Sequence, residues 1–463
     1  MQAGPLDSEL NLKEIEETVK KYWDDIDIKK YISDKYSDKE PIAFVEGPPT
    51  LNGNPHIGHI RGRIIKDVWY RFNVLNNRNV IFRGGWDTQG LPVELQAEKE
   101  LGLTGSKIDN LKKIGEETLI QSCKDLIMNY YKTWLKSDKL LGMSLDHDKA
   151  YWTFKDEYIE REWKYLEKAW ENGILEEREA VVPYCPNCQT SLSHAEVSQG
   201  YENVEDPSLY YKVKLADEDA FLILWTTMPF TVITDMMTGV KPESLYSYIK
   251  VNNEIWIVAN ERLEELMTIF HIENFELIKE VQGKSLDGLK YIHPLTEKYI
   301  PELHNLSNTN GVHCIVAEDF VDLSTGTGLV HISPANGEID FDIGKKRNIP
   351  LFNPIDDRAC FTEEAGKFAG LPVRDANQLV FDLLTKENSL VKLGRLKHEY
   401  PLCWRSGHRL LWVARRAYFY QVDKLGDKAI NAAQSIEYYF EQPKNRFIEI
   451  IKEKRPWCIS RER

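Results

Sequence analysis

The chain has 463 residues, 42% of them hydrophobic, and a formal net charge of −14 at pH 7. This length is enough for two to four domains with sizeable cores. The negative balance excludes a strongly cationic surface of the chromatin-binding kind, although local basic stripes could still contact a nucleic acid.

No targeting or membrane segment is visible. The first residues, MQAGPLDSELNLKEIEETVKKYW, lack the apolar core of a signal peptide, and no apolar run approaches membrane-spanning length. Only two of the seven cysteines, Cys185 and Cys188, form a close pair, which fits a reduced protein better than a disulfide scaffold. We therefore expect a soluble cytoplasmic protein with no membrane partner.

The N-terminal third predicts helices and a parallel sheet. Apolar residues at spacings of three and four predict an amphipathic helix laid against a core: Leu12, Ile15, Val19, Trp23 and Ile26. A short buried strand is expected at 42–45 and is stopped by Gly47-Pro48-Pro49. Helical spacing then runs from Ile60 to Phe72, and a second strand is expected at 79–82, ending at Gly84-Gly85. This strand–helix–strand order predicts a βαβ unit.

From about residue 181 the pattern changes to short β-rich runs such as LYYKVKL, AFLILWTT, IWIVAN and GTGLVHISP. We interpret this as a β-rich domain inserted into an α/β domain. The expected division is a helical arm at 1–40, the first part of the α/β domain at 41–180, the insertion at 181–402 and a return to the α/β domain at 403–463.

The stretch GPPTLNGNPHIGHIRGR (47–63) carries the first chemical signal. A loop that leaves a parallel strand and enters a helix N-terminus offers free N–H groups and a positive helix end to an anion. Gly58 permits close approach of a ligand, and His56 and His59 can donate hydrogen bonds to phosphate oxygens. The alternative is a pair of ordinary polar loop histidines.

Five ordered stretches resemble a known family. The P-P-x-x-N-G-x-x-H-I-G-H pattern resembles the HIGH signature of class I aminoacyl-tRNA synthetases. GGWDTQGLPVE (84–94) resembles a block of the isoleucyl enzymes, with Gln89 where that family usually has histidine. WTTMPFT (225–231) and GTGLVHISPANGEIDF (326–341) resemble their two editing motifs, and WCISRER (457–463) resembles their W-C-I-S-R-Q-R block. The chain is similar to isoleucyl-tRNA synthetases of archaeal or eukaryotic type.

The resemblance implies a Rossmann-like parallel sheet with an inserted β-rich editing domain. It implies that isoleucine is activated with ATP and Mg²⁺ and then transferred to tRNA(Ile), by a cytoplasmic monomer. His56, Gly58 and His59 would bind ATP and stabilise the pentacovalent phosphate. Gly47, Pro48 and Asp87 would line the amino-acid pocket, where a desolvated ammonium needs a carboxylate. Without the resemblance, Asp87 would read as a turn residue.

The insertion would remove misattached valine. A pocket discriminates poorly between side chains that differ by one methylene, a problem for which isoleucyl-tRNA synthetases are themselves the standard example. By resemblance, Thr226, Thr231, His331 and Asp340 would form the editing pocket, with Asp340 holding the α-ammonium group. Met228 stands where many members have threonine, so a hydroxyl is missing there. Without the motif, the two threonines would read as strand surface.

The C-x-x-C spacing of Cys185 and Cys188 is typical of a zinc knuckle. Cys403 and His408 could complete it, whereas Ser406 stands where relatives with a second C-x-x-C have cysteine. Because the two halves flank the insertion, zinc would join its connecting strands. The alternative is a metal-free turn.

Two basic clusters could contact tRNA, and their alternative is a salt-bridged surface. The first is Arg61, Arg63, Lys66, Arg71 and Arg78; the second is Arg405, Arg409, Arg415 and Arg416.

The second ATP signature, KMSKS, is absent, so an N-terminal part of the enzyme with weak or no aminoacylation is expected. The competing hypotheses are a valyl or leucyl enzyme, a freestanding editing hydrolase that clears mischarged tRNA, and a tRNA-binding module without chemistry.

Overall fold

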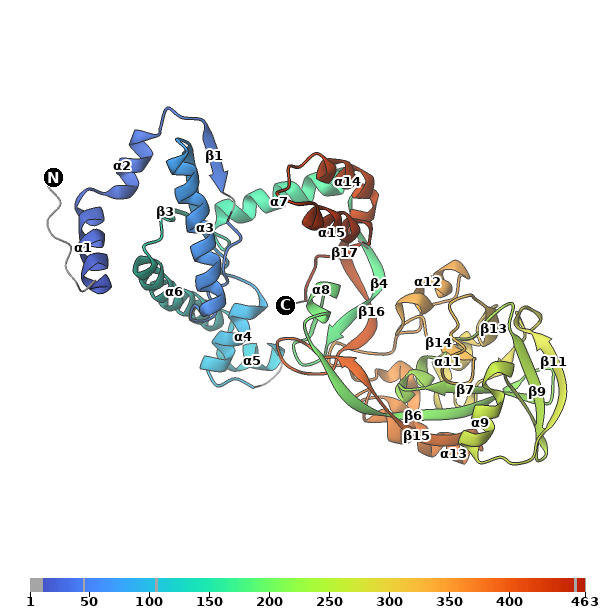
Figure 1. Ribbon diagram of the computed structural model, residues 1–463. Coiled ribbons are helices and arrows are strands. Elements are labelled where there is room, and N and C mark those ends of the chain that lie inside the picture. Colours follow the sequence, from blue (N-terminus) through green and yellow to red (C-terminus); the bar gives the residue numbers. More distant parts are fainter. Residues whose placement is uncertain (1–10, 45, 105–106, 454–455, 463) are drawn as a thin grey trace. The chain divides into compact units, whose positions relative to one another are not determined.

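The computed structural model describes residues 11–44, 46–104, 107–453 and 456–462. The chain forms two compact units, the N-terminal unit (Met1–Lys168) and the C-terminal unit (Ala169–Arg463). Figure 1 shows both as mixtures of helices and strands, so the expected α/β class is confirmed. Among the described residues, no helix combines the length and the apolar composition needed to cross a membrane.

The N-terminal unit is built on a three-stranded parallel sheet in the order β1-β2-β3. Its strands are β1 (Pro41–Phe44), β2 (Asn79–Trp86) and β3 (Asp146–Trp152), and helix α3 (Ile57–Leu75) connects β1 to β2. The predicted βαβ unit is therefore confirmed, although β2 is longer than the expected strand. Ile42 lies opposite Val80 in the parallel register.

The main core of the N-terminal unit lies between the sheet and helices α4 (Leu91–Glu100) and α6 (Glu116–Leu141). Its largest fully buried side chains are Trp86 and Trp134. Besides α3, the helices are α1 (Leu12–Asp25), α2 (Ile28–Lys35), α4 (Leu91–Glu100), α5 (Lys107–Ile114), α6 (Glu116–Leu141) and α7 (Asp156–Glu171), the last of which runs into the C-terminal unit.

Two expectations about burial were wrong, and helix α3 shows an unexpected exposed face. Helix α1 forms as predicted, but none of its residues is buried, and Leu12 is 64% exposed. Strand β1 alternates between exposed and partly exposed residues, and Val45 lies outside the described residues. Helix α3 turns its apolar stripe outward, with Val68 61% and Phe72 63% exposed. Its buried residues include the polar side chains of Arg63, Asp67 and Asn73. The helical spacing therefore located this helix correctly, and the structure shows which of its faces is buried.

The C-terminal unit contains the predicted β-rich insertion. Its main sheet has the order β11-β9-β10-β7-β6-β12, and β15 also pairs with β6. A smaller sheet has the order β13-β8-β14. The strands are β6 (Tyr201–Leu215), β7 (Ala220–Thr226), β8 (Met237–Val240), β9 (Leu245–Val251), β10 (Glu254–Ala259), β11 (Glu276–Gln282), β12 (Tyr291–Ile292), β13 (Cys314–Ala317), β14 (Val330–Ile332) and β15 (Leu390–Pro401).

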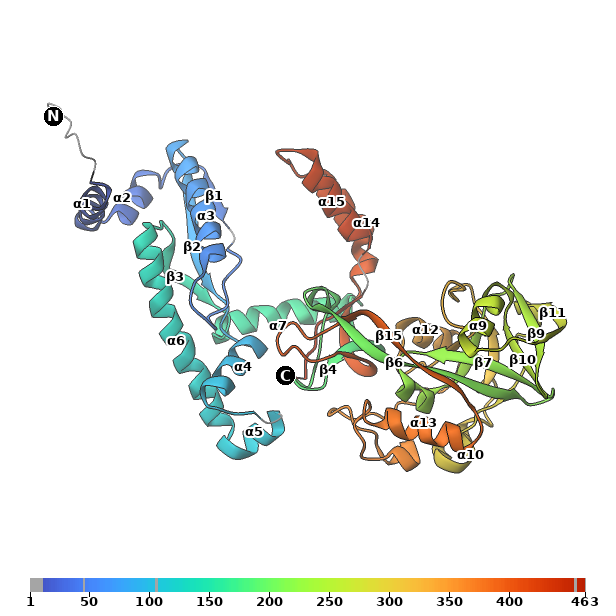
Figure 2. The ribbon, with the colours of Figure 1, turned by 60° about the horizontal axis from the view of Figure 1, so that its bottom comes forward.

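Two long antiparallel pairs carry the chain into and out of the insertion. Strand β4 (Leu175–Cys185) pairs with β16 (Leu411–Tyr420), and β6 pairs with β15. Figure 2 shows β6 and β15 running side by side. Strands β5 (Thr190–Ser191) and β17 (Trp457–Cys458) complete the sheet around β4 and β16. Residues far apart in sequence, including the cysteines near 185 and 403, are thereby brought together.

Helices cover the sheets of the insertion and follow β16. One large apolar core joins the two sheets, with side chains such as Phe230, Tyr211 and Phe368 fully buried. The helices are α8 (His194–Val197), α9 (Leu263–Phe270), α10 (Thr296–Tyr299), α11 (Pro301–Leu306), α12 (Glu338–Lys346), α13 (Ala376–Lys386), α14 (Gly426–Gln434) and α15 (Glu441–Lys452), with a 3-10 turn, η1, at Pro229–Thr234.

Candidate functional site

Two histidines close the N-terminal end of helix α3. The Nδ1 atom of His56 accepts a hydrogen bond from the backbone N–H of Gly58 at 3.1 Å. The Nδ1 atom of His59 accepts one from the backbone N–H of His56 at 3.2 Å, and the two rings are stacked 3.6 Å apart. This reciprocal cap provides partners for N–H groups that a helix N-terminus otherwise leaves unsatisfied.

The cap also determines which imidazole nitrogens carry protons. Because Nδ1 accepts in both rings, each neutral imidazole carries its proton on Nε2. Burial lowers the pKa of His59, and the nearby His56 and Arg63 lower it further. A Cβ on Gly58 would crowd His56, at 3.0 Å from its Cε1 atom. The N-terminus of α3 thus offers two Nε2–H donors beside the positive end of the helix dipole. This arrangement can bind a phosphate group.

The loop after β1 lies against the end of β2. Leu51 donates its backbone N–H to the carbonyl oxygen of Asp87 at 2.9 Å. The Thr50 hydroxyl donates to the Asp87 carboxylate at 2.5 Å. The structure therefore joins Asp87 to the loop that begins with Gly47 and Pro48, which is the set of residues assigned by resemblance to the amino-acid pocket.

A glycine beside this loop lets an aromatic ring pack against the backbone. A Cβ on Gly85 would lie 2.3 Å from Cζ of Tyr151, so a side chain cannot be placed there without moving the ring. The Tyr151 hydroxyl donates to the carbonyl oxygen of Glu46 at 2.7 Å. Tyr151 therefore ties the residue before Gly47 to β3, a role that no sequence motif indicated.

In the insertion, Thr231 joins the two editing-like motifs. Its hydroxyl donates to the carbonyl oxygen of Met228 at 2.7 Å and lies 3.1 Å from Nε2 of His331. Because the Thr231 hydroxyl gives its proton to the Met228 carbonyl, it can only accept a hydrogen bond from His331. Nε2 of the neutral His331 ring therefore carries the proton, and Nδ1 is an acceptor. That Nδ1 atom has no hydrogen-bond partner among the described residues. The Thr226 hydroxyl accepts the N–H of Met228 at 3.0 Å, so Thr226, Thr231 and His331 form one connected set.

Asp340 lies in the first turn of α12. One of its carboxylate oxygens accepts the backbone N–H of Ser333 at 2.9 Å. Burial raises the pKa of Asp340 to about 6, although the Ser333 N–H opposes this shift. A Cβ on Gly337 would lie 2.7 Å from Cγ of Asp340. Most molecules carry the carboxylate at pH 7, so Asp340 can bind an ammonium group, whereas burial lowers the pKa of His331 to about 4 and keeps it neutral.

Three buried polar residues support this site and were missed by the sequence reasoning. The Thr234 hydroxyl lies 2.7 Å from the Ser333 hydroxyl and donates to Oδ1 of Asn336 at 2.8 Å. Nδ2 of Asn336 donates to the carbonyl oxygen of Trp412 at 3.0 Å. The network holds η1 against the loop between His331 and Asp340. The sequence did contain one indication of this role, because Ser333 and Asn336 lie within the second editing-like motif (326–341).

The structure brings together Cys185, Cys188 and Cys403. All three are buried, and their sulfur atoms lie within 4.8 Å of one another. The Ser406 hydroxyl lies 3.4 Å from Sγ of Cys185. His408 is exposed, and its Nδ1 faces the carbonyl oxygen of Ser406 at 2.9 Å. Three thiolates this close together can bind one zinc ion, and His408 is not part of this group of described residues.

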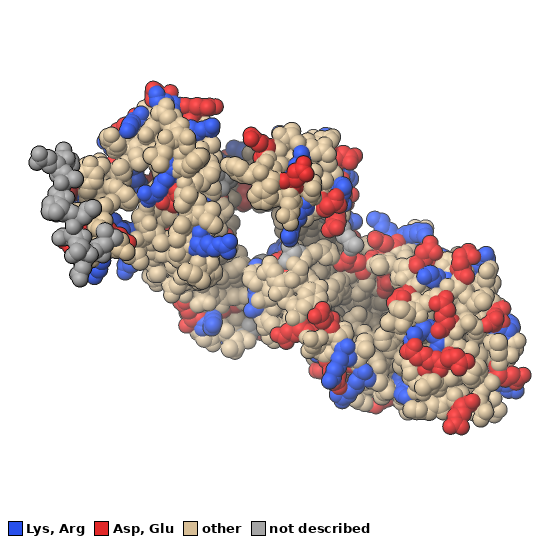
Figure 3. Space-filling view, viewed as in Figure 1, with Lys and Arg blue, Asp and Glu red and all other residues tan. Residues whose placement is uncertain are grey.

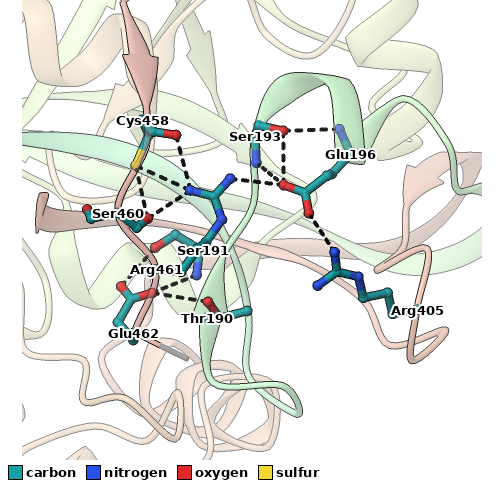
Figure 4. Close-up of polar contacts among 9 residues, drawn as sticks. All are labelled: Thr190, Ser191, Ser193, Glu196, Arg405, Cys458, Ser460, Arg461 and Glu462. Carbon is teal, nitrogen blue, oxygen red and sulfur yellow. Dashed lines mark hydrogen bonds and ion pairs between the residues drawn. The ribbon is translucent and has the colours of Figure 1, made fainter. Parts of the chain in front are cut away.

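Residues 457–462 are held by contacts of Arg461 and Glu462 to α8 and β5 (Figure 4). Arg461 contacts the Glu196 carboxylate at 3.1 Å. The Glu462 carboxylate accepts the backbone N–H and the hydroxyl of Ser191, both at 2.9 Å. Glu196 also pairs with Arg405 at 3.3 Å, two residues after Cys403. The last described residues are thus linked to the loop that carries the third cysteine.

Most of the basic residues predicted to contact tRNA form ion pairs with carboxylates of the protein itself. Lys66 pairs with Glu46 at 2.7 Å and Arg71 with Asp67 at 2.6 Å, while Arg63 is only 3% exposed. In the second cluster, every arginine contacts a carboxylate: Arg405 with Glu196, Arg409 with Asp206, Arg415 with Asp357 and Arg416 with Glu177. Basic and acidic side chains are likewise interspersed over the visible face in Figure 3. The salt-bridge interpretation fits these residues better.

A cavity of about 530 Å³ lies in the N-terminal unit beside α1 and α2. Its lining includes Trp23, Tyr70 and Asp138 but none of the motif residues named above. The candidate ATP and amino-acid residues therefore lie outside this cavity.

Comparisons with known proteins agree with the motifs. A family model described as tRNA synthetases class I (I, L, M and V) matches residues 18–463. The isoleucine–tRNA ligase of Methanocaldococcus jannaschii is 37% identical over 98% of this chain, which covers 44% of that protein. The isoleucine–tRNA ligase of Pyrococcus abyssi is 35% identical over 98% of the chain and 43% of its own length. The chain thus spans less than half the length of these relatives.

Among solved structures, the Agrobacterium radiobacter K84 agnB2 LeuRS, in a ternary complex with tRNA and LeuAMS, aligns with a TM-score of 0.34 and 15% identity. That alignment covers 86% of this chain and 48% of the other. With the family model matching nearly the whole sequence, the chain belongs to the class I tRNA synthetases (I, L, M and V).

Proposed function

We propose that this chain is the segment of an isoleucine–tRNA ligase that carries the HIGH-type ATP site and the editing insertion. The observation that carries this proposal is the identity of 35–37% with isoleucine–tRNA ligases over 98% of the chain. The whole enzyme would use ATP with Mg²⁺ to form isoleucyl-adenylate and pyrophosphate, and would then transfer isoleucine to tRNA(Ile).

In the activation step, Nε2–H groups of His56 and His59 would donate to phosphate oxygens of ATP as charge develops on the α-phosphate. Asp87, held by Thr50, would pair with the ammonium of isoleucine beside Gly47 and Pro48. The reciprocal cap supports this assignment because it places Nε2–H donors at a helix N-terminus.

In the editing step, the insertion would hydrolyse Val-tRNA(Ile). Asp340 would hold the α-ammonium of valine, and the Nδ1 acceptor of His331 would orient the attacking water. A neutral imidazole whose pKa is about 4 is a weak base, so its role there is orientation rather than full proton abstraction. Thr226 and Thr231 would shape the pocket around the aminoacyl ester.

We also propose that Cys185, Cys188 and Cys403 hold one Zn²⁺ as thiolates, with the Ser406 hydroxyl at the fourth position. Such an ion would have a structural role, joining the strands that enter and leave the insertion. Burial of all three sulfur atoms supports this assignment.

The editing assignment is tested by deacylation of Val-tRNA(Ile), with Ile-tRNA(Ile) and Thr-tRNA(Val) as controls. We expect selective release of valine. Equal release from all three substrates would point to a nonspecific esterase, and no release by the folded chain would contradict a self-sufficient editing domain. Selective action on Thr-tRNA(Val) would instead favour the valyl alternative.

A freestanding editing hydrolase is the other candidate function. It predicts valine release without any binding of ATP or isoleucine. Calorimetric titration of the chain with ATP–Mg²⁺ and with isoleucine separates the two, since a ligase segment should bind at least one of them.

A further inference from the structure

Arg63 is a charged residue that the structure buries where its sequence position suggested a surface role. It lies on the inner face of α3, five residues after Gly58, and is 3% exposed. Its guanidinium contacts two buried carboxylates, Glu46 at 3.4 Å and Asp138 at 3.3 Å. A side chain sequestered in this way cannot contact tRNA.

Two tryptophans enclose the same guanidinium. Its central carbon lies 5.4 Å from the ring of Trp86 and 5.3 Å from the ring of Trp134. Both rings are almost completely buried. A flat guanidinium can stack against two indoles and still contact carboxylates through its edge, which an ammonium group cannot do equally well.

Three of the four neighbours, Glu46, Trp86 and Trp134, lead directly to a segment of the candidate active site, whereas Asp138 belongs to α6. Glu46 immediately precedes Gly47, and Trp86 immediately precedes Asp87. The third, Trp134, donates its indole N–H to the carbonyl oxygen of Gly53 at 3.0 Å. That ring also lies 4.8 Å from the imidazole of His59. The loop that begins at Gly47, the N-terminus of helix α3 and the end of β2 therefore all meet around the side chain of Arg63.

Stability is a weak explanation for this cluster. Buried ion pairs can often be replaced by neutral residues of similar size without loss of stability. Among the described residues, Nη2 of Arg63 and Oε2 of Glu46 also have no hydrogen-bond partner, although both are buried. The cluster therefore carries a desolvation cost that packing alone does not require.

We propose that Arg63 is a positioning residue that holds the ATP-binding and amino-acid-binding segments in register with each other. This inference rests on the proposed ligase function. Arg63 does not contact the reactants; it acts through Glu46, Trp86 and Trp134 on the residues that would. Displacing such a support by about 1 Å can cost on the order of 100-fold in a positioned reaction.

The test compares variants that preserve the fold. The first is Arg63→Met, and the second is a neutral triple variant, Arg63→Met with Glu46→Gln and Asp138→Asn. Arg63→Lys keeps the charge but loses the planar face. The matched control is Arg71→Met on the same helix, which removes the pair with Asp67 and the contact with the Trp23 ring but leaves Arg63, Trp86 and Trp134 in place. Binding of a nonhydrolysable isoleucyl-adenylate analogue is measured by calorimetry, and folding by circular dichroism.

We expect the wild type and Arg71→Met to bind the analogue within about twofold of each other. Arg63→Met and the neutral triple variant should bind at least about 30-fold more weakly, with a partial recovery in Arg63→Lys. The triple variant should keep a thermal midpoint close to that of the wild type, so it decides the question even if the single variant does not fold.

Wild-type affinity in a folded triple variant would overturn the positioning role. A wild type that binds neither the analogue nor ATP would instead overturn the proposed function, and the role of Arg63 with it.

Discussion

The candidate ATP site and the candidate editing site are built in opposite ways. His56 and His59 hold each other through contacts that span two or three residues of sequence, at an exposed helix end. Thr231 and His331 meet across 100 residues, inside a core shared by two sheets. A site made from local contacts depends mainly on its own helix, whereas one made from distant contacts depends on the whole insertion.

The largest effect is expected from a substitution in the cluster of Cys185, Cys188 and Cys403. This cluster links the strands that enter and leave the insertion, and it has no part in the N-terminal unit. Cys188→Ser should abolish zinc binding, seen as a fall from about one zinc per chain to near zero by metal analysis. In zinc-finger peptides a structural zinc contributes on the order of 10 kcal/mol. The thermal transition of the C-terminal unit should therefore shift most, while the N-terminal unit remains stable.

The control is Cys314→Ser, a buried cysteine outside the group. Equal loss of zinc in both variants, or no zinc in the wild type purified with a reducing agent, would contradict the assignment.

The second prediction concerns the stability cost of the Asp340 carboxylate in the candidate editing site. The pKa of Asp340 is about 6 in the folded protein, above the value of about 3.9 for an unfolded aspartate. The folded state therefore holds the proton more tightly, and the resulting stabilisation, complete below pH 4, is lost as the pH rises through 6. Asp340→Asn should then be more stable than the wild type by about 3 kcal/mol at pH 7, measured by urea unfolding.

This gain should vanish near pH 3.5, where the wild-type side chain is protonated in both states. His331 contributes with the opposite sign: its lowered pKa of about 4 means that stability falls as the pH drops from about 6.5 to 4. A stability gain for Asp340→Asn that is independent of pH would show that the carboxylate is not the cause.

The third prediction concerns activity at the same residue. Asp340→Ala should slow hydrolysis of Val-tRNA(Ile) by about 30-fold, since a hydrogen bond to a charged group contributes about 1.5–3 kcal/mol. The rate is measured in single-turnover deacylation, with Asp342→Ala as the control because that side chain is exposed on the same helix. Equal rates of hydrolysis in the two variants would show that Asp340 has no specific role in editing.

The smallest effect should come from the local site. His56→Ala removes the Nδ1 acceptor at the N-terminus of α3, and loss of such a cap costs about 1 kcal/mol. His56→Asn should restore most of it, because the amide oxygen can accept the same N–H group. Chemical unfolding of the N-terminal unit measures the difference, and an unchanged midpoint in His56→Ala would show that the cap contributes little.

The sequence alone determined the local elements and the order of the motifs. The βαβ unit, the helix after the HIGH-like stretch and the β-rich insertion were all predicted, because backbone periodicity and turn residues act over short distances. The family could be recognised for the same reason: each motif is a short stretch whose residues act together.

Only the tertiary structure decided which side chains share an environment. It turned the apolar stripe of α3 outward, buried Arg63 between two tryptophans, and brought Ser406 rather than His408 beside the cysteines. It also joined Thr231 to His331 and raised the pKa of Asp340. Burial and electrostatics depend on what packs around a residue, and that information is spread along the whole chain rather than written in any local pattern.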